Sequence, residues 1–231
     1  MASLSMTDRV YELLKADIIS CVLEPGQQIV QSQLVEKYGA GLTPVREAAQ
    51  RLVQEGFISP VPRLGYIVSP VTISDIHEIY ELRLIAECAA ARLAAIRAPS
   101  AVIDEICRKA DFTYVHNDRW SYSEFLAINA AFHVLIASAS GNQRLVDLVS
   151  RTLDELNRVF HLGLDVRDSA EEMRAEHLAL AAALRDHNAG VAEETMRAQI
   201  ERSQTRVLDA LMRRTSPLDT DQFQQSIVIS G

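Results

Sequence analysis

The stretch from residue 39 to residue 56, GAGLTPVREAAQRLVQEG, carries outward-facing side chains of the types that contact nucleic acid. At helical spacing, one face of this stretch presents Thr43, Arg46, Gln50 and Arg51. An arginine fork can hold a phosphate or the edge of a guanine, and hydroxyl and amide groups can hydrogen-bond phosphates and bases. The pattern therefore predicts a short helix that reads DNA.

Two pairs of polar residues, each four positions apart, offer a different chemistry further along the chain. Arg83 and Glu87 lie in YELRLIAE, and Asn129 and His133 lie in NAAFH, so each pair projects from one face of a predicted helix. Taken by itself, the first pair is a helix-surface ion pair worth about 0.2–0.5 kcal/mol. His133 is either a core histidine bonded to a neighbour or part of a ligand pocket.

The predicted DNA-reading helix has its own start and stop signals. Thr43 can serve as its N-cap, and Pro44 suits the first helical position because its missing N–H would be unpaired there. Gly56 supplies a left-handed residue that ends the helix. Its inward side is an apolar stripe made of Val45, Ala48, Ala49, Leu52 and Val53. These signals indicate the second helix of a helix-turn-helix.

The segments on either side of this helix complete a winged helix-turn-helix. An amphipathic helix over residues 7–22, an LEPG turn, a brief strand at Ile29 and Val30 and a helix over residues 31–38 are expected before it. After it, two short apolar runs flank Pro62-Arg63-Leu64-Gly65, which is typical of a hairpin. A plain packing hairpin is the alternative. Arg63 at the tip favours a wing, in which Gly65 lets the backbone approach a phosphate closely.

From Ser74, which is expected to cap a helix, the pattern is helical almost to the end. Breaks that contain Pro, Gly or Asn-Asp separate six predicted helices, near residues 74–97, 100–116, 121–139, 143–161, 168–186 and 190–213. Short connections predict an antiparallel bundle. The expected fold class is therefore mainly α: a winged helix-turn-helix over 1–70, an all-α bundle over 71–214 and a flexible tail over 215–231.

Composition and cysteine usage narrow the class of protein. A chain of 231 residues can hold two modest domains that each bury a core. There is no run of about 18 apolar residues and no basic start leading into an apolar segment, so neither a membrane span nor a secretory signal is expected. Cys21, Cys88 and Cys107 are odd in number and far apart, which favours reduced thiols in a cytoplasmic protein and disfavours a cysteine metal site.

The net charge of −8 gives no general support to DNA binding. Up to Ser69 the chain has six basic and seven acidic residues, so the remainder carries a net charge of −7. Non-specific attraction to phosphates should be weak, and affinity should depend on a few placed arginines and on pairing two copies.

Longer motifs resemble a known family. LEPGQQI, TPVREAAQRLVQEGFI and PRLGYIV resemble the DNA-binding domain of GntR-type bacterial transcription regulators. IYELRLIAECAAARLAA, NAAFHVLIASASGNQRL and EHLALAAALRDHNAGVAEETMRAQI resemble the FadR-type C-terminal (FCD) effector domain. The resemblance implies that operator DNA is touched by Thr43, Arg46, Gln50, Arg51, Arg63, Gly65 and Tyr66. Leu42 departs from the family, which often places a DNA-contacting arginine there.

The resemblance also implies a pocket in the helical domain, lined by Arg83, Asn129, His133, His177 and Gln199. Metal-binding FCD domains use an Asp, then a His four residues later, then two further His. In this chain Asn129 and Gln199 replace the usual Asp and the last His, which weakens a Zn or Ni site formed by Asn129, His133 and His177. Without a metal, Arg83 becomes the main anchor for an anionic effector.

These observations lead to one expectation and two alternatives. The expected protein is a homodimeric, cytoplasmic regulator, most simply a repressor, that binds a palindromic operator and responds to a small carboxylate metabolite. A metal-sensing regulator with the ion held by His133 and His177 is the first alternative. A helical-bundle metalloenzyme is the remote one, because no HExxH spacing and no evident general base accompany the histidines. The chain is therefore not expected to be an enzyme or a membrane protein.

Overall fold

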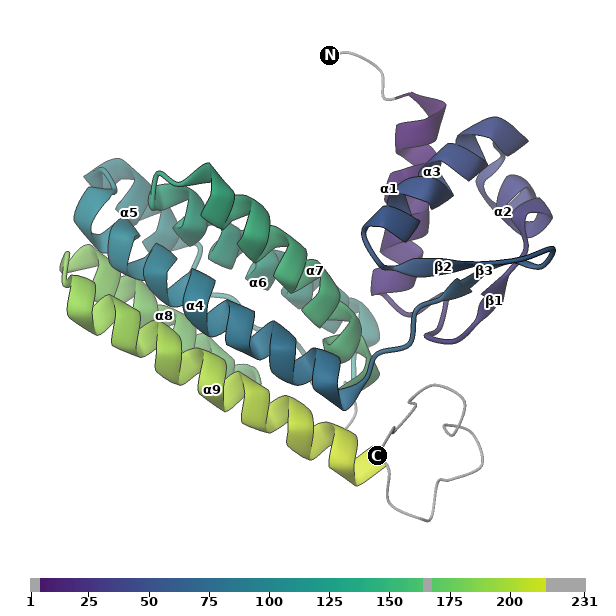
Figure 1. The fold of residues 1–231 in the computed structure, drawn as a ribbon. Helices are drawn as coiled ribbons and strands as arrows, with labels where there is room; N and C mark the ends of the chain where they lie inside the picture. The colour runs from purple at the N-terminus through teal and green to yellow at the C-terminus, as the bar shows by residue number, and fades with distance from the viewer. Residues whose placement is uncertain (1–4, 164–167, 215–231) are drawn as a thin grey trace. The chain divides into compact units, whose positions relative to one another are not determined.

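A computed structural model describes residues 5–163 and 168–214 of the chain. The predicted flexible tail at 215–231 lies outside the described residues. The chain divides into two compact units, one running to Ile73 and the other beginning at Ser74. The described part of the first unit combines helices with a small sheet, and that of the second is helical (Figure 1). The expected fold class, mainly α with a winged N-terminal unit and a helical bundle, is thus confirmed.

The first unit has the element order of a winged helix-turn-helix, with α1 (Met6–Ile19), β1 (Gln28–Ile29), α2 (Gln31–Tyr38), α3 (Leu42–Gln54), β2 (Ile58–Val61) and β3 (Gly65–Val68). Helix α2 spans the predicted residues. Helix α1 ends at Ile19 rather than at residue 22, because Ser20 caps it and Cys21 adopts a left-handed φ of 56°. The LEPG turn therefore follows the helix and does not itself stop it.

Helix α3 begins two residues earlier than expected, at Leu42 rather than at Pro44. Gly41 is its N-cap, and the N–H of Val45 donates to the Gly41 carbonyl at 3.3 Å. Pro44 has no N–H to offer to the preceding turn, so the first helical hydrogen bond is the one made by Val45. Thr43 lies inside the first turn, and the prediction that it caps the helix is wrong.

The end of α3 is formed as predicted. Gly56 has a φ of 81°, a conformation that side chains disfavour. The N–H of Gly56 donates to the Val53 carbonyl at 3.1 Å, and the N–H of Phe57 donates to the Leu52 carbonyl at 2.9 Å. These two bonds form a Schellman motif, which satisfies carbonyls that the helix end leaves unpaired.

The hairpin predicted after α3 is present and forms part of a three-stranded antiparallel sheet with the order β1-β3-β2. In the register, Ile58 faces Val68 and Ile29 faces Tyr66. Strand β1 begins one residue earlier than expected, at Gln28. The core between this sheet and the helices buries Val10, Leu14, Ile18, Leu34, Val45, Ala48, Ala49, Leu52, Phe57, Ile58, Tyr66 and Val68. The predicted apolar stripe of α3 is thereby confirmed.

The second unit consists of α4 (Ile73–Arg97), α5 (Ser100–Arg108), α6 (Arg119–Ala139), α7 (Gln143–Gly163), α8 (Ala170–Arg185) and α9 (Ala189–Arg214). The long helices run side by side in a bundle (Figure 1). Alanines on α4, among them Ala86 and Ala90, pack on Ala137 of α6 and on Val149 and Leu153 of α7. The predicted helix cap at Ser74 is wrong, because α4 starts at Ile73 and the Ser74 hydroxyl instead donates to Glu78 at 3.2 Å.

Helix α5 is much shorter than the predicted helix over residues 100–116. It ends at Arg108, and residues 109–118 lack regular secondary structure. Two aromatic rings explain the early end. Phe112 packs 5.3 Å from the ring of Phe125 on α6, and the Tyr114 hydroxyl accepts a hydrogen bond from the N–H of Ser169 at 3.0 Å. Burying these rings in the bundle outweighs continuing the helix.

Helix α6 contradicts the expectation that no segment is long and apolar enough to span a membrane. Its residues Trp120–Ala139 are long and apolar enough to do so by length and composition alone. In the structure, Phe125, Phe132 and Ile136 of this helix are buried in the bundle. A core helix of a helical bundle passes the same compositional test, and α6 has that position here.

Candidate functional site

The outward face of α3 presents the polar side chains that the sequence singled out. Thr43, Arg46 and Gln50 are exposed. The Arg46 Nε donates to Oε1 of Gln31, the first residue of α2, at 3.1 Å. The Gln31 amide in turn donates to the Tyr66 hydroxyl on β3 at 3.4 Å. Gln31 thus connects the arginine of the reading helix to the base of the wing.

Arg51 is engaged within the protein to a greater extent than Arg46. Its guanidinium donates to Asp8 of α1 at 2.8 Å and lies 3.7 Å from the centre of the Tyr11 ring. Hydrogen bonds from Ser5 and Arg51 lower the pKa of the Asp8 carboxyl. The Tyr11 hydroxyl continues the contact by donating to Glu55 at 2.7 Å. Arg51 therefore fastens α1 to α3, in addition to any contact with DNA.

The three wing residues have different environments. Arg63 is exposed at the tip, with a left-handed φ of 64°. Gly65 has a φ of 102°, and a Cβ there would lie 2.3 Å from the Ile29 carbonyl oxygen. The absent side chain of Gly65 is thus required for β1 to pair with β3. Tyr66 is buried, with only 7% of its surface exposed, so its ring belongs to the core and only its hydroxyl reaches Gln31.

Within the bundle, α4 and α6 are joined by a buried polar cluster. One oxygen of the Glu87 carboxylate accepts from the Arg83 Nε at 2.6 Å, and the other lies 2.6 Å from the His133 Nδ1. All three residues are at most 3% exposed. The interpretation of Arg83 and Glu87 as a weak helix-surface pair is therefore wrong. An i,i+4 pair in an apolar interior loses its hydration, so its partners depend on one another far more than a surface pair does.

The ionisation of the Glu87 carboxyl follows from its neighbours. Burial raises the pKa of the Glu87 carboxyl, but Arg83 and His133 lower it by a larger amount. The pKa therefore falls to about 2. Glu87 is therefore an anion near neutral pH. The Arg83 Nε and one terminal nitrogen, at 2.6 Å and 3.4 Å, serve Glu87. Since a guanidinium has five N–H donors, Arg83 retains donor capacity for a ligand.

His177 on α8 lies beside this cluster with no hydrogen-bond partner for either ring nitrogen among the described residues. Its ring stacks on Phe112 at 4.4 Å and meets His133 edge-on at 5.8 Å between ring centres. Burial, assisted by His133, Arg206 and Arg83, lowers the pKa of His177 to about 2. The side chain is therefore neutral and offers both a donor and an acceptor in a buried position.

Gln199 and Asn129 are the remaining residues predicted to line the pocket. Both are buried, on α9 and α6 respectively. The Gln199 Oε1 has no hydrogen-bond partner in the part of the chain that the structure describes. Arg83 and His133 contact each other through Glu87, and His133 meets the ring of His177, whereas Asn129 and Gln199 are buried on α6 and α9. Buried polar atoms without partners are costly, which makes them candidates for contact with a ligand.

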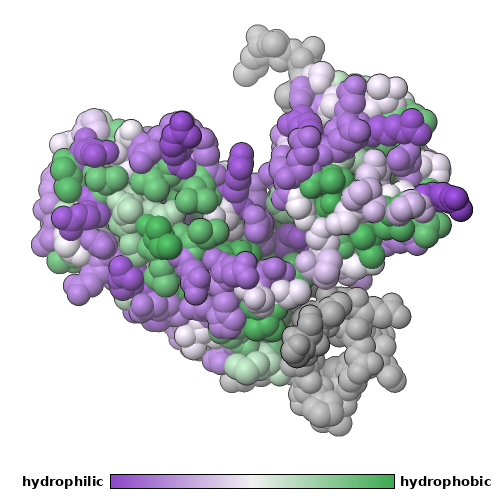
Figure 2. Space-filling model, in the orientation of Figure 1, coloured by the Kyte–Doolittle hydropathy of each residue, from purple (hydrophilic) through white to green (hydrophobic). Residues whose placement is uncertain are grey.

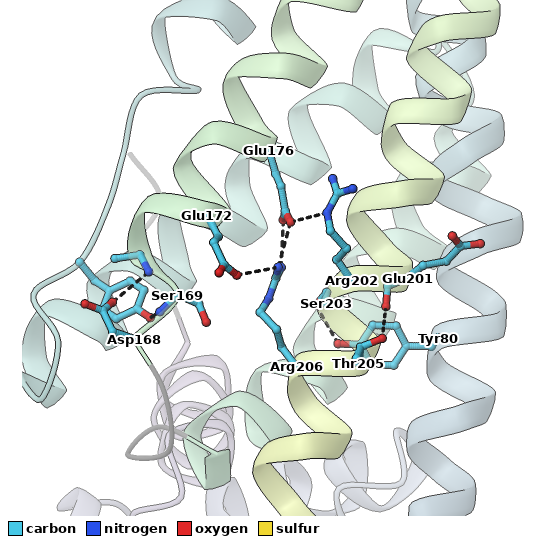
Figure 3. A network of polar contacts seen from close by, with 12 residues as sticks. Tyr80, Asp168, Ser169, Glu172, Glu176, Glu201, Arg202, Ser203, Thr205 and Arg206 are labelled. Atoms are coloured by element: carbon cyan, nitrogen blue, oxygen red, sulfur yellow. Dashed lines mark hydrogen bonds and ion pairs between the residues drawn. The ribbon is translucent and has the colours of Figure 1, made fainter.

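A second arginine cluster lies where α8 packs against α9 (Figure 3). Glu176, next to His177, accepts from the Arg202 Nε at 2.7 Å and from both terminal nitrogens of Arg206 at 2.9 Å. One turn before Arg206 on α9, the Ser203 hydroxyl lies 2.8 Å from the Tyr80 hydroxyl. This cluster joins α8 to α9 through a bidentate pair, the geometry in which arginine binds carboxylates most strongly.

The residues at the expected metal positions do not fit a tightly held divalent ion. The described residues contain no group of three or more His, Cys, Asp or Glu side chains arranged for a metal. His133 is engaged by Glu87, and the other donors are the neutral amides of Asn129 and Gln199. Two imidazoles and two amides lack the anionic donors that support such sites. The orphaned atoms of His177 and Gln199 suit an organic ligand that hydrogen-bonds.

Several residues in these sites were not predicted: Gln31, Phe112, Glu176 and Arg206. Glu87 was seen only as a partner of Arg83. A signal for Glu87 was present, since it lies in AECAAA, where alanine and cysteine surround it on every side of the helix. A charge among such small apolar residues is expected to lie on the buried face of the helix, where it must be paired. No local signal identifies Gln31, Phe112, Glu176 or Arg206.

Family models match both units of the chain. Residues 6–68 match the model of bacterial regulatory proteins of the gntR family, and residues 78–202 match the FCD domain. The first unit is therefore the DNA-binding winged helix of a transcriptional regulator, and the second is the helical domain that accompanies it. The chain belongs to the GntR family, in the subfamily that carries an FCD domain.

Relatives and solved structures agree with this assignment. The repressor RspR of Escherichia coli is 23% identical over 195 residues, covering 83% of this chain and 84% of that protein. The repressor GlaR of the same species is 26% identical over 200 residues, covering 81% and 89%. The fold resembles E. coli McbR/YncC, with a TM-score of 0.74 at 21% identity over 90% of this chain and 100% of that one. A GntR regulator from Rhodococcus sp. RHA1 has a TM-score of 0.73 at 23% identity, covering 90% and 99%.

Proposed function

We propose that this regulator is a homodimeric, cytoplasmic repressor that binds a palindromic operator and is released by a small carboxylate. Residues 1–70 read DNA, and residues 71–214 bind the effector and join two copies. The repressor role is supported by the two E. coli relatives named as repressors. Two copies are needed because one reading helix contacts too few base pairs to select a single site in a genome.

In this proposal Arg46 is the main reading residue. It is exposed on α3, flanked by Thr43 and Gln50, and its Nε is oriented by Gln31. Arg63 contacts the DNA backbone from the tip of the wing. Arg51 adds phosphate contact from a position fixed by Asp8 and Tyr11. Gly65 and Tyr66 act by shaping the wing, since the first accommodates β1 and the second fills the core.

The observation that carries the effector site is the group of unpartnered polar atoms around His177. Both of its ring nitrogens and the Gln199 Oε1 are buried and lack hydrogen-bond partners among the described residues. A bound molecule that hydrogen-bonds these atoms would remove their cost. Arg83, with donors beyond those given to Glu87, supplies the positive charge that selects a carboxylate.

Release follows from differential affinity. A carboxylate would bind tightly only to the conformation of the bundle in which both Arg83 and His177 can contact it. Its binding therefore shifts the protein population toward that conformation. His177 is adjacent to Glu176, which Arg202 and Arg206 bind from α9. A shift of α8 at the pocket is thereby transmitted to α9. The bundle binds its ligand without transforming it.

The test uses purified protein, its operator fragment and a panel of small mono- and dicarboxylates. An effector should raise the melting temperature and weaken operator binding measured by fluorescence anisotropy. His177→Phe and Gln199→Leu replace the unpartnered polar groups with apolar ones, so both variants should bind the operator and ignore the effector. Gln204→Leu, on the same helix as Gln199 but near His77, should respond as the wild type does.

The proposal is rejected if no carboxylate changes either stability or operator binding. It is also rejected if the two pocket variants respond as strongly as the wild-type protein.

A further inference from the structure

One face of α4 carries large aliphatic side chains that nothing in the described residues covers. Leu82, Ile85, Ala89 and Ile96 recur at spacings of three, four and seven and therefore share one line along the helix. Leu82, Ile85 and Ile96 are 44%, 70% and 59% exposed, and Ala89 is half-buried between them. We call these four residues the α4 stripe. Figure 2 shows hydrophobic residues gathered on the face of the bundle over α4 and α7.

The stripe is energetically significant as a group. Single exposed aliphatic residues are ordinary, but a contiguous apolar patch with a polar rim marks an interaction site. Burying Leu and Ile side chains is favourable in proportion to the apolar area removed from water. On α7, the partly buried Leu145 and Leu148 extend the apolar surface next to the core that α4 and α7 share.

We propose that the α4 stripe is the dimer contact, packed antiparallel against the same stripe of a second copy with the two-fold axis at Ala89. This inference rests on the homodimer proposed above and specifies its interface. A two-fold contact must be self-complementary, because a residue that contacts a second residue of the other copy is itself contacted by that residue of its partner in the same way. With the axis at Ala89, Leu82 of one copy meets Ile96 of the other. The small side chain at the crossing point lets the two helices approach closely.

The charges along α4 match this arrangement. Glu81 and Arg97 are equally distant from Ala89 in opposite directions, so the antiparallel contact places Glu81 of one copy beside Arg97 of the other. Glu81 has no hydrogen bond or ion pair with any described residue, and the Arg97 guanidinium uses one nitrogen to reach the Ser140 carbonyl at 2.9 Å. A parallel contact would instead oppose like charges, which is destabilising.

Arg92 lies on the same line as the stripe but is drawn aside. Its terminal nitrogen lies 3.3 Å from Glu193 on α9. The guanidinium is thereby directed toward the edge of the stripe, which keeps the centre apolar and gives the contact a charged rim.

Cysteine cross-linking of the full-length protein tests the position of the axis. Facing Cα atoms at a close helix crossing fall within disulfide reach, about 4.4–6.8 Å. Ala89→Cys should therefore form a covalent dimer under mild oxidation. Leu82→Cys alone should not, because its counterpart lies far along the other helix, whereas Leu82→Cys combined with Ile96→Cys should. The wild-type protein, with its native Cys21, Cys88 and Cys107, and Val191→Cys on α9 are the controls.

Sedimentation tests the energetics independently. Ile85→Arg places two unpaired charges in the contact and should raise the dimer dissociation constant at least about 100-fold. Val191→Arg, at another exposed aliphatic position, should leave it unchanged, and circular dichroism should show that both variants are folded. A dimer that persists in Ile85→Arg, or an Ala89→Cys variant that does not cross-link, overturns this interface while leaving the proposed dimer intact. A wild-type protein that sediments as a monomer at all concentrations and on its operator overturns both.

Discussion

The Nδ1 of His133 lies 2.6 Å from Oε2 of Glu87, so a histidine that has two interpretations in the sequence is bound to a buried carboxylate. The second oxygen of that carboxylate holds Arg83 at 2.6 Å. Glu87 therefore connects α4 to α6 and also fixes the direction of the guanidinium that we propose binds the effector. Glu87 therefore contributes both to the stability of the bundle and to the proposed ligand site.

Glu87→Gln should destabilise the protein severely. The substitution leaves the buried Arg83 charge without its anion, and breaking a buried pair in this way costs about 3–5 kcal/mol. Urea unfolding followed by circular dichroism measures the loss. Glu193→Gln breaks an exposed pair with Arg92 and should cost no more than about 1 kcal/mol. Equal effects of the two substitutions would show that the Glu87 cluster is not energetically buried.

The neutral state of His177 predicts a particular dependence of stability on pH. The unfolded chain binds a proton at this residue below a pKa of 6.5, whereas the folded chain does so only near a pKa of about 2. The unfolded state therefore binds more protons as the pH falls below 6.5, and stability falls by at most about 1.4 kcal/mol per pH unit from this group. His177→Phe should reduce this slope between about pH 6.5 and about pH 4.5.

The exposed residue His77, replaced by Gln, provides the matched control for that experiment. It should leave the slope of the wild-type protein unchanged. If His177→Phe has the same pH profile as the wild-type protein, His177 is protonated in the folded state, and the assignment of a neutral imidazole to it is wrong.

Arg46 and Arg51 should separate in function although both lie on α3. Arg46→Ala should abolish specific operator binding with little change in melting temperature, because Arg46 is exposed and its Nε bond to Gln31 lies on the surface. Arg51→Ala should lower stability by about 1–2 kcal/mol, because it removes both the Asp8 pair and the stack on Tyr11. It should also retain measurable binding. Normal operator binding by Arg46→Ala would show that α3 does not dock as proposed.

The glycine at the start of β3 should not tolerate a side chain. Gly65→Ala places a Cβ 2.3 Å from the Ile29 carbonyl oxygen in a left-handed backbone, so β1 must separate from β3. We expect faster amide hydrogen exchange at Gln28 and Ile67 and weaker operator binding. Gly39 has a φ of 60°, and a Cβ added there has nothing within 4 Å. Gly39→Ala should therefore lower the free energy of unfolding only by the left-handed backbone penalty, about 1–2 kcal/mol. A Gly65→Ala variant with wild-type exchange would contradict the close approach.

The winged unit could be predicted well from sequence because its signals are local. Gly56 specifies the end of α3, and alternation around a Pro/Gly turn specifies the hairpin. Where the prediction of α3 failed, the N-cap is Gly41, two residues before the predicted Thr43. Pro44 suits either start, because the N–H groups of the first helical turn have no partner within the helix. Errors of this kind displace the end of an element by a residue or two without changing its buried face.

The proposed effector pocket was harder to predict from the sequence, because the residues in contact there lie far apart in the chain. Phe112 belongs to a segment expected to be helical, and its ring is placed by His177 and Phe132, which come later. The pairing of Arg206 with Glu176 joins residues 30 positions apart. Periodicity identifies which face of a helix is buried, but it does not show which charged residues of two helices meet there.

Gln31 contacts both Arg46 and Tyr66, so the residue that we propose reads DNA is distinct from the residues that orient it. An arginine held by its Nε has a restricted set of orientations toward a base edge. Substitutions at Tyr66 or Gln31, neither of which needs to touch DNA, can therefore alter which operator sequence is preferred. Related regulators could acquire new target genes through changes behind the reading helix, with its DNA-facing residues unaltered.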